Sequence, residues 1–215
     1  MRGFHWHPQP TSVAPARRAA LKAGIRGEVV LDPFCGTGSL VLAAVKAGAD
    51  RAIGSDIEDW GFALRPELER ILSSRTLDGR RKVELHWRVD AMDAIERFDH
   101  SVLFTDPPDP HDVIGGHKFS TLREIRRTGL YWTGADLRRF WKERLSEKNM
   151  MAKKGETIRY VISLIRRELE AGRRVVLHAY SKVWARGCKF DWQRELRRHG
   201  LRFLELEGPY VEVMK

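Results

Sequence analysis

Short apolar runs separated by amphipathic stretches set the hydrophobic pattern of this 215-residue chain. They predict buried strands at 29–31, 52–54, 101–105 and 175–179, and alternation predicts another strand at 83–89. Helical spacing of apolar residues predicts helices at about 14–24, 40–47, 67–74, 91–97, 135–148, 156–171 and 191–199. Two final runs, 201–206 and 210–214, flank Gly208-Pro209 and predict a closing hairpin. Strands that alternate with helices favour an α/β fold.

The stretch VVLDPFCGTGSL, residues 29–40, reads as a strand, a glycine loop and the start of a helix. Asp32 stands where the strand ends. Gly36 and Gly38 allow a tight turn and a close approach of backbone N–H groups to a ligand. Ser39 is the expected cap of the next helix. Because ligands of open α/β sheets bind beyond the carboxyl ends of the strands, this loop predicts a cofactor site.

The string D-P-F-C-G-T-G-S resembles the first motif of class I S-adenosylmethionine (SAM) methyltransferases, in the form typical of enzymes that methylate exocyclic amino groups of nucleic-acid bases. The resemblance, with the order of elements, implies a Rossmann-like α/β fold: a seven-stranded, mostly parallel sheet with helices on both faces. It also implies SAM as the cofactor. The cofactor-binding residues then expected are Asp32, Pro33, Phe34, Gly36, Thr37, Gly38, Asp56, Ile57, Asp90 and Ala91.

Two further carboxylates follow predicted strands. Asp56 comes eighteen residues after Gly38, a spacing typical of an acidic residue that binds ribose hydroxyls; a helix cap is the alternative role. Asp90 follows the third strand, where the resemblance implies a contact with the adenine amine. Asp90 also stands directly before the helix predicted at 91–97 and could simply cap it.

The second motif is Asp106-Pro107-Pro108-Asp109, directly after the fourth strand. It resembles the catalytic motif of amino methyltransferases. The amine of a nucleobase is a poor nucleophile because its lone pair is delocalised into the ring. Hydrogen bonds from the amine to the carboxylate of Asp106 and to the carbonyl of Pro107 would favour a pyramidal nitrogen aimed at the methyl donor. Asp106, Pro107 and Pro108 are therefore the predicted catalytic residues.

The fourth motif position is usually aromatic in that family and stacks on the target base, but here it is Asp109. The segment after it mixes basic and aromatic residues, which suits single-stranded nucleic acid. Its predicted substrate-binding residues are Asp109, His111, Lys118, Phe119, Arg123, Arg126, Arg127, Tyr131 and Trp132. Phe119, Tyr131, Trp132 and Trp6 are the candidates for the missing ring.

Charge is distributed unevenly within the net charge of +10. Residues 28–116 hold ten Lys/Arg and seventeen Asp/Glu, whereas residues 117–202 hold twenty-three Lys/Arg and nine Asp/Glu. A basic half beside an acidic cofactor half predicts a polyanionic substrate. The alternative is a set of solvated helix faces in a heat-adapted protein, which the depletion of amides (one Asn, two Gln) also favours.

Length and composition predict one α/β domain over 1–215, and the resemblance implies a methyltransferase domain with an N-terminal segment and helix at 1–27 and a substrate-facing insertion at 110–150. His7-Pro8 resembles a family segment that closes over SAM; a frayed terminus is equally compatible. His5 and His7 have no partners at ligand spacing, so we expect no metal site. Two cysteines, and no apolar run of membrane-span or secretory-signal length, favour a cytoplasmic protein.

These observations favour a SAM-dependent N-methyltransferase that acts on an exocyclic base amine, guanine N2 or cytosine N4, in tRNA or rRNA. A protein partner for substrate capture is possible, since no separate RNA-binding domain is evident. One alternative is a DNA amino methyltransferase, which shares both motifs. The other is an inactive SAM-binding scaffold subunit, an alternative that the presence of Asp109 at the usually aromatic position supports.

Overall fold

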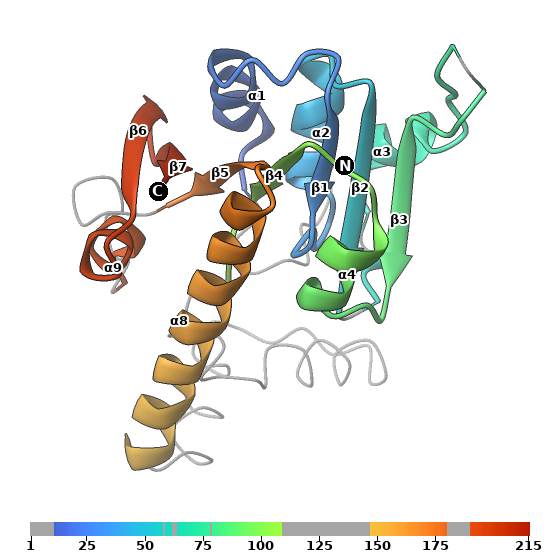
Figure 1. Cartoon of the computed structure of the whole chain (residues 1–215). Coiled ribbons are helices and arrows are strands. Elements are labelled where there is room, and N and C mark those ends of the chain that lie inside the picture. The colour runs from blue at the N-terminus through green and yellow to red at the C-terminus, as the bar shows by residue number, and fades with distance from the viewer. Residues whose placement is uncertain (1–10, 58, 62–63, 78, 109–146, 180–189) are drawn as a thin grey trace. The chain divides into compact units, whose positions relative to one another are not determined.

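A seven-stranded mixed sheet forms the centre of the computed structural model, which describes residues 11–57, 59–61, 64–77, 79–108, 147–179 and 190–215 (Figure 1). The strands are β1 (Val29–Asp32), β2 (Arg51–Asp56), β3 (Val83–Trp87), β4 (Val102–Thr105), β5 (Arg174–His178), β6 (Arg202–Glu207) and β7 (Tyr210–Met214), in the order β3-β2-β1-β4-β5-β7-β6. β7 pairs antiparallel with both of its neighbours, β5 and β6, and the other neighbouring strands pair in parallel. The sheet confirms the predicted Rossmann-like class I methyltransferase fold.

Helices cover both faces of this sheet (Figure 1). They are α1 (Val13–Lys22), α2 (Ser39–Lys46), α3 (Pro66–Ile71), α4 (Ala91–Arg97), α8 (Glu147–Glu170) and α9 (Trp192–Arg198). One core joins α1, α2 and Leu68 of α3 to a face of the sheet that includes Val30, Ala52 and Val102. On the other face, α4 and the C-terminal part of α8 are linked by an ion pair between Glu96 and Arg167, 2.5 Å apart.

The chain divides into two compact units. One unit comprises residues 1–107 and 162–215 and contains the whole sheet; the other comprises residues 108–161. The described part of the second unit is Pro108 and the helical residues 147–161 of α8. The predicted single domain with a substrate-facing insertion at 110–150 stays a prediction. No helix in the described ranges combines the length and apolarity that crossing a membrane requires.

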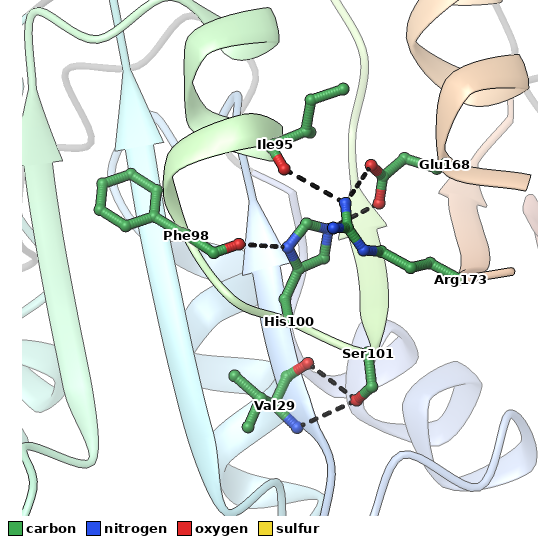
Figure 2. A network of polar contacts seen from close by, with 7 residues as sticks. All are labelled: Val29, Ile95, Phe98, His100, Ser101, Glu168 and Arg173. Atoms are coloured by element: carbon green, nitrogen blue, oxygen red, sulfur yellow. Dashed lines mark hydrogen bonds and ion pairs between the residues drawn. The ribbon is translucent and has the colours of Figure 1, made fainter. Parts of the chain in front are cut away.

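A buried polar network anchors the amino end of β4 (Figure 2). The imidazole of His100 contacts the carbonyl oxygen of Phe98 at 2.7 Å and the carboxylate of Glu168 at 2.6 Å. Arg173 donates to Glu168 at 2.8 Å and to the carbonyl of Ile95 at 3.1 Å. Because a buried carboxylate is costly unless it is paired, these bonds hold α4, α8 and the starts of β4 and β5 in one arrangement.

The predicted break between helices at 135–148 and 156–171 is wrong, because α8 runs without interruption from Glu147 to Glu170. Two other local predictions also need correction. Ser39 does not cap α2: Gly38 occupies the cap position in a left-handed conformation, and the Ser39 hydroxyl instead accepts a hydrogen bond from Arg65 at 2.8 Å. The third strand ends at Trp87 rather than at Val89, because Arg88 has a φ of +61°, which extended strands do not tolerate. The turn at Arg88 leads the chain to Asp90 and the start of α4.

Candidate functional site

The strand order places the chemistry-bearing residues at one edge of the sheet. Asp32 and Asp56 end β1 and β2, and Asp106 directly follows β4. Since β2, β1 and β4 are parallel neighbours, their carboxyl ends share this edge. The strand order reverses at β1, between β2 and β4, and such a switch point is where open α/β sheets bind ligands. The two sequence motifs therefore lie on adjacent strands around the switch point.

The glycine loop has the backbone geometry that its sequence predicts. Gly36 and Gly38 have φ angles of +48° and +79°, in the region that favours glycine. The N–H of Gly36 donates to Oδ2 of Asp56 at 2.9 Å, so the carboxylate at the end of β2 braces the loop that follows β1. A Cβ atom at Gly38 would lie 2.1 Å from Cδ2 of the buried Leu68. Helix α3 thus packs directly against the start of α2.

Asp32 is buried and held by two donors. Its Oδ1 accepts the hydroxyl of Thr105 at 2.6 Å and the N–H of Phe34 at 3.2 Å. Burial nevertheless raises the pKa of Asp32 from 3.8 to about 8, because desolvation outweighs the two hydrogen bonds, and the charges of Asp106 and Asp56 raise it further. At neutral pH the Asp32 carboxyl is therefore largely protonated in the absence of a ligand.

Asp56, the last residue of β2, and Ile57, the residue after it, lie in contrasting environments. The Asp56 residue is only 8% exposed, whereas Ile57, next in the chain, is 61% exposed. A carboxylate has about four lone-pair sites, and one of those on Asp56 accepts from Gly36. The pair therefore combines a hydrogen-bond acceptor with an open apolar side chain at the switch-point edge. The alternative role for Asp56, a helix cap, does not apply to α3, because α3 begins ten residues later with Arg65 as its cap.

Asp90 has the capping role that was its alternative. Its Oδ1 accepts the N–H of Met92 at 2.8 Å, at the start of α4. Ala91 is buried as the first residue of that helix. One oxygen of the Asp90 carboxylate is thus used by the backbone, so an adenine contact, which stays a prediction, would share the carboxylate with the cap.

Two segments distant in the sequence contact the carboxylate of Asp106. Its Oδ2 accepts the hydroxyl of Thr11, and its Oδ1 lies 3.0 Å from Nδ1 of His178, the last residue of β5. Arg65 in turn donates to the carbonyl of Thr11 at 3.1 Å. The segment before α1 is therefore attached at the end of β4. Pro107 is buried, and Pro108, in the other compact unit, is partly buried.

Thr11 and His178 were not predicted from the sequence. A threonine before a helix and a histidine at a strand end are common, and neither carries a motif. Strand register is the signal that would have indicated His178: Thr105 pairs with Leu177 across β4 and β5, so Asp106 and His178 are the next positions on neighbouring strands. Thr11 approaches Asp106 from ninety-five positions earlier in the chain, which no local pattern predicts.

The predicted substrate-binding residues lie outside the described residues. They are Asp109, His111, Lys118, Phe119, Arg123, Arg126, Arg127, Tyr131 and Trp132, and Trp6 and His7-Pro8 also lie outside. Their roles stay predictions. Within the described residues, the candidate site consists of the residues at the strand ends, from Asp56 to His178.

Comparisons with known proteins give matches in structure alone. No protein-family model matches the chain, and no curated protein matches it. Similar solved structures include a candidate RNA methyltransferase of Pyrococcus horikoshii (14% identity, 99% of this chain and 88% of that one, TM-score 0.42). A candidate SAM-dependent methyltransferase of Streptococcus mutans has 12% identity, with 92% of this chain and 46% of that one covered and a TM-score of 0.39. A candidate methyltransferase of Escherichia coli has 21% identity, with 58% of this chain and 70% of that one covered and a TM-score of 0.35.

The chain spans less than half the length of several other similar structures. One of them is a subunit of a Trypanosoma brucei complex, of which 28% is covered. At these identities the likeness concerns the fold alone.

Proposed function

We propose that this protein is a SAM-dependent methyltransferase that methylates an exocyclic base amine of RNA. The observation that carries the proposal is the position of Asp106: it directly follows β4, and Thr105 beside it is hydrogen-bonded to Asp32 at the end of β1. A carboxylate of catalytic-motif type therefore lies next to the glycine loop of cofactor-motif type, at the switch point of the sheet.

The residues at this edge fit SAM, which carries a cationic sulfonium, an amino-acid group, a ribose and an adenine. Gly36 and Gly38 would lie under its methionine end, because the glycine loop presents backbone rather than side chains. Asp56 would accept hydrogen bonds from the ribose hydroxyls, and exposed Ile57 would pack on the adenine. The hydroxyl of buried Ser55, which makes no hydrogen bond within the described residues, is a further polar group beside Asp56.

SAM supplies an electrophilic methyl group when it is bound. Asp106 would accept a hydrogen bond from the base amine, and the carbonyl of Pro107 would accept the second. Both prolines lack an N–H and cannot compete for these acceptors. The two bonds favour a pyramidal nitrogen and orient its lone pair, so the contribution of the chain is positioning and electrostatic stabilisation.

RNA is the proposed substrate because the net charge of residues 117–202 is strongly positive, as counted above. Basic side chains that replace condensed counterions provide sequence-independent affinity for a polyanion. Guanine N2 and cytosine N4, in tRNA or rRNA, are the proposed acceptor groups, by the resemblance of the two motifs. A partner protein for substrate capture belongs to the same proposal.

Two measurements test the proposal. Calorimetry with SAM and with S-adenosylhomocysteine should give saturable one-to-one binding, and absence of binding to either would contradict the cofactor assignment. Transfer of the labelled methyl group of SAM should then be compared on unmodified RNA transcripts and on duplex DNA. Transfer to RNA supports the proposal, and transfer to DNA alone would favour the DNA amino methyltransferase.

The substitution of Asp109 for the usual aromatic residue keeps a scaffold function as a second candidate. An inactive subunit would bind SAM and transfer no methyl group to any acceptor. The two measurements together distinguish this outcome from a protein that binds no SAM at all.

A further inference from the structure

His178 belongs to neither sequence motif, yet its Nδ1 lies 3.0 Å from Oδ1 of Asp106. We propose that His178 is a positioning residue for the Asp106 carboxylate: its imidazole N–H fixes the orientation in which that carboxylate receives the base amine. The inference rests on the proposed function, since it assigns a role in the same methyl transfer.

Strand pairing determines the position of His178. Thr105 of β4 pairs with Leu177 of β5, and Asp106 and His178 are the residues that directly follow this pair on the two strands. On its other side β5 pairs with β7, where His178 lies opposite Tyr210. The imidazole and the fully buried Tyr210 ring have centroids 4.6 Å apart at an interplanar angle of 32°. The His178 side chain is only 10% exposed and is thus held between a carboxylate and an aromatic ring.

The two oxygens of Asp106 face different groups. Thr11 donates to Oδ2 from the segment before α1, while His178 approaches Oδ1 from β5. The His178 contact has ion-pair distance without the alignment of a linear hydrogen bond. Contacts of this kind are often poorly aligned before substrate binds and tighten in the reactive complex. With about four lone-pair sites on the carboxylate, both contacts leave acceptor capacity for the amine.

Two substitutions separate the hydrogen-bond donor from the packing. His178→Phe keeps a ring that can pack on Tyr210 and removes the donor, whereas His178→Asn retains an N–H near the position of Nδ1. His199→Phe is the matched control, because His199 ends α9 and has no contact with the candidate site among the described residues. Thermal unfolding followed by circular dichroism checks that each variant is folded.

The rate of the chemical step is measured by single-turnover transfer from labelled SAM to RNA, with calorimetry for SAM affinity. Loss of a hydrogen bond to a charged group predicts that His178→Phe lowers the rate by roughly 10–100-fold. We expect His178→Asn to retain most of the rate, and the KM for RNA and the affinity for SAM to change little in both variants. His199→Phe should match the parent protein.

A second readout does not depend on the reaction. The ¹⁵N resonances of the His178 ring report which nitrogen carries the proton. They should show a protonated Nδ1 in the parent and change in Asp106→Ala. An unchanged spectrum would overturn the contact itself. If His178→Phe fails to fold, the rate of His178→Asn and this spectrum decide.

The outcomes distinguish the inference from the function on which it rests. If the parent transfers no methyl group to RNA, the proposed function fails and the positioning role fails with it. If the parent transfers and His178→Phe transfers equally fast, the inference alone is wrong. Equal losses in His178→Phe and His178→Asn, with parent-like folding, would also overturn it, because the N–H donor would then not be the relevant feature.

Discussion

The hydroxyl of Thr105 donates to the carboxyl of Asp32 at 2.6 Å and so joins the end of β4 to the end of β1. The bond lies between residues seventy-three positions apart. It connects the residue before the Asp106 motif to the first acidic residue of the glycine-loop motif. Both partners are buried, so the contact is shielded from solvent competition and holds the two strand ends in register.

Substitution of Asp106 should affect the chemical step and spare cofactor binding. A positioned electrostatic contact typically contributes about 10²–10³-fold in rate, so Asp106→Ala should lose that factor. Asp106→Asn should be milder, since an amide oxygen still accepts a hydrogen bond. Single-turnover transfer with RNA gives the rate, and calorimetry gives the SAM affinity.

Asp99→Ala is the control for Asp106, because Asp99 is exposed and precedes the amino end of β4. If transfer occurs and Asp106→Ala proceeds at the parent rate, the catalytic assignment is wrong although the fold assignment stands.

Substitution of Asp56 should weaken SAM binding. Asp56→Ala removes the proposed ribose acceptor and the bond that braces Gly36, and lost hydrogen bonds to a charged group predict a decrease of about 1–3 kcal/mol in binding free energy. Calorimetry measures the difference. Asp50→Ala provides the comparison, since Asp50 is exposed and precedes β2 at the opposite edge of the sheet. Equal affinities in the two variants would remove Asp56 from the cofactor site.

Alanine at Gly38 should destabilise the fold by more than its backbone conformation alone explains. At a φ of +79° an alanine costs roughly 1–2 kcal/mol. The added Cβ would also overlap Leu68, and overpacking costs about 1–3 kcal/mol more. Gly200→Ala isolates the first effect, because Gly200 has a φ of +74° and open space around it. Urea unfolding of both variants should show the larger loss at Gly38; equal losses would contradict the close packing of α3 on α2.

The raised pKa of Asp32 should make the free energy of unfolding fall as pH rises. Its pKa is about 8 in the folded protein and 3.8 ordinarily, so between about pH 4 and pH 8 the folded state binds the extra proton. The free energy of unfolding therefore decreases with pH across this window and levels off above it. Asp32→Asn should lack this contribution. Urea unfolding at several pH values, compared between parent and variant, measures it; parallel profiles would show that Asp32 is ionised in the folded state.

Salt should weaken RNA binding steeply if the basic half holds the polyanion. Each phosphate contact contributes a slope of about −0.7 to −0.9 in log K against log salt. Single charge reversals should reduce both affinity and slope and leave SAM affinity nearly unchanged; the residues to change are Arg123, Arg126, Arg127, Arg138 and Arg139. Arg70→Glu is the control, because it changes the net charge equally at an exposed position of α3 in the acidic half. Filter binding at several salt concentrations measures the slope, and a flat dependence would favour a small-molecule substrate.

The order of the elements and the residues at strand ends could be predicted from the sequence. Apolar runs with period two or 3.6 depend on local spacing, so β1, β4 and α4 were predicted to within a residue or two. The glycines of the loop were predictable for the same reason, since positive φ angles are accessible mainly to glycine. The predicted ends of elements were wrong where the backbone conformation of one residue set the end, as at Arg88 and Gly38.

Only the tertiary structure decided which distant side chains meet. Strand order brings Asp32, Asp56 and Asp106 to one edge, and burial there gives Asp32 its raised pKa. The approach of Thr11 and His178 to Asp106 likewise depends on three-dimensional position. The physical reason is that hydrophobic patterning specifies which face of each element is buried, whereas strand pairing and register determine which polar ends become neighbours.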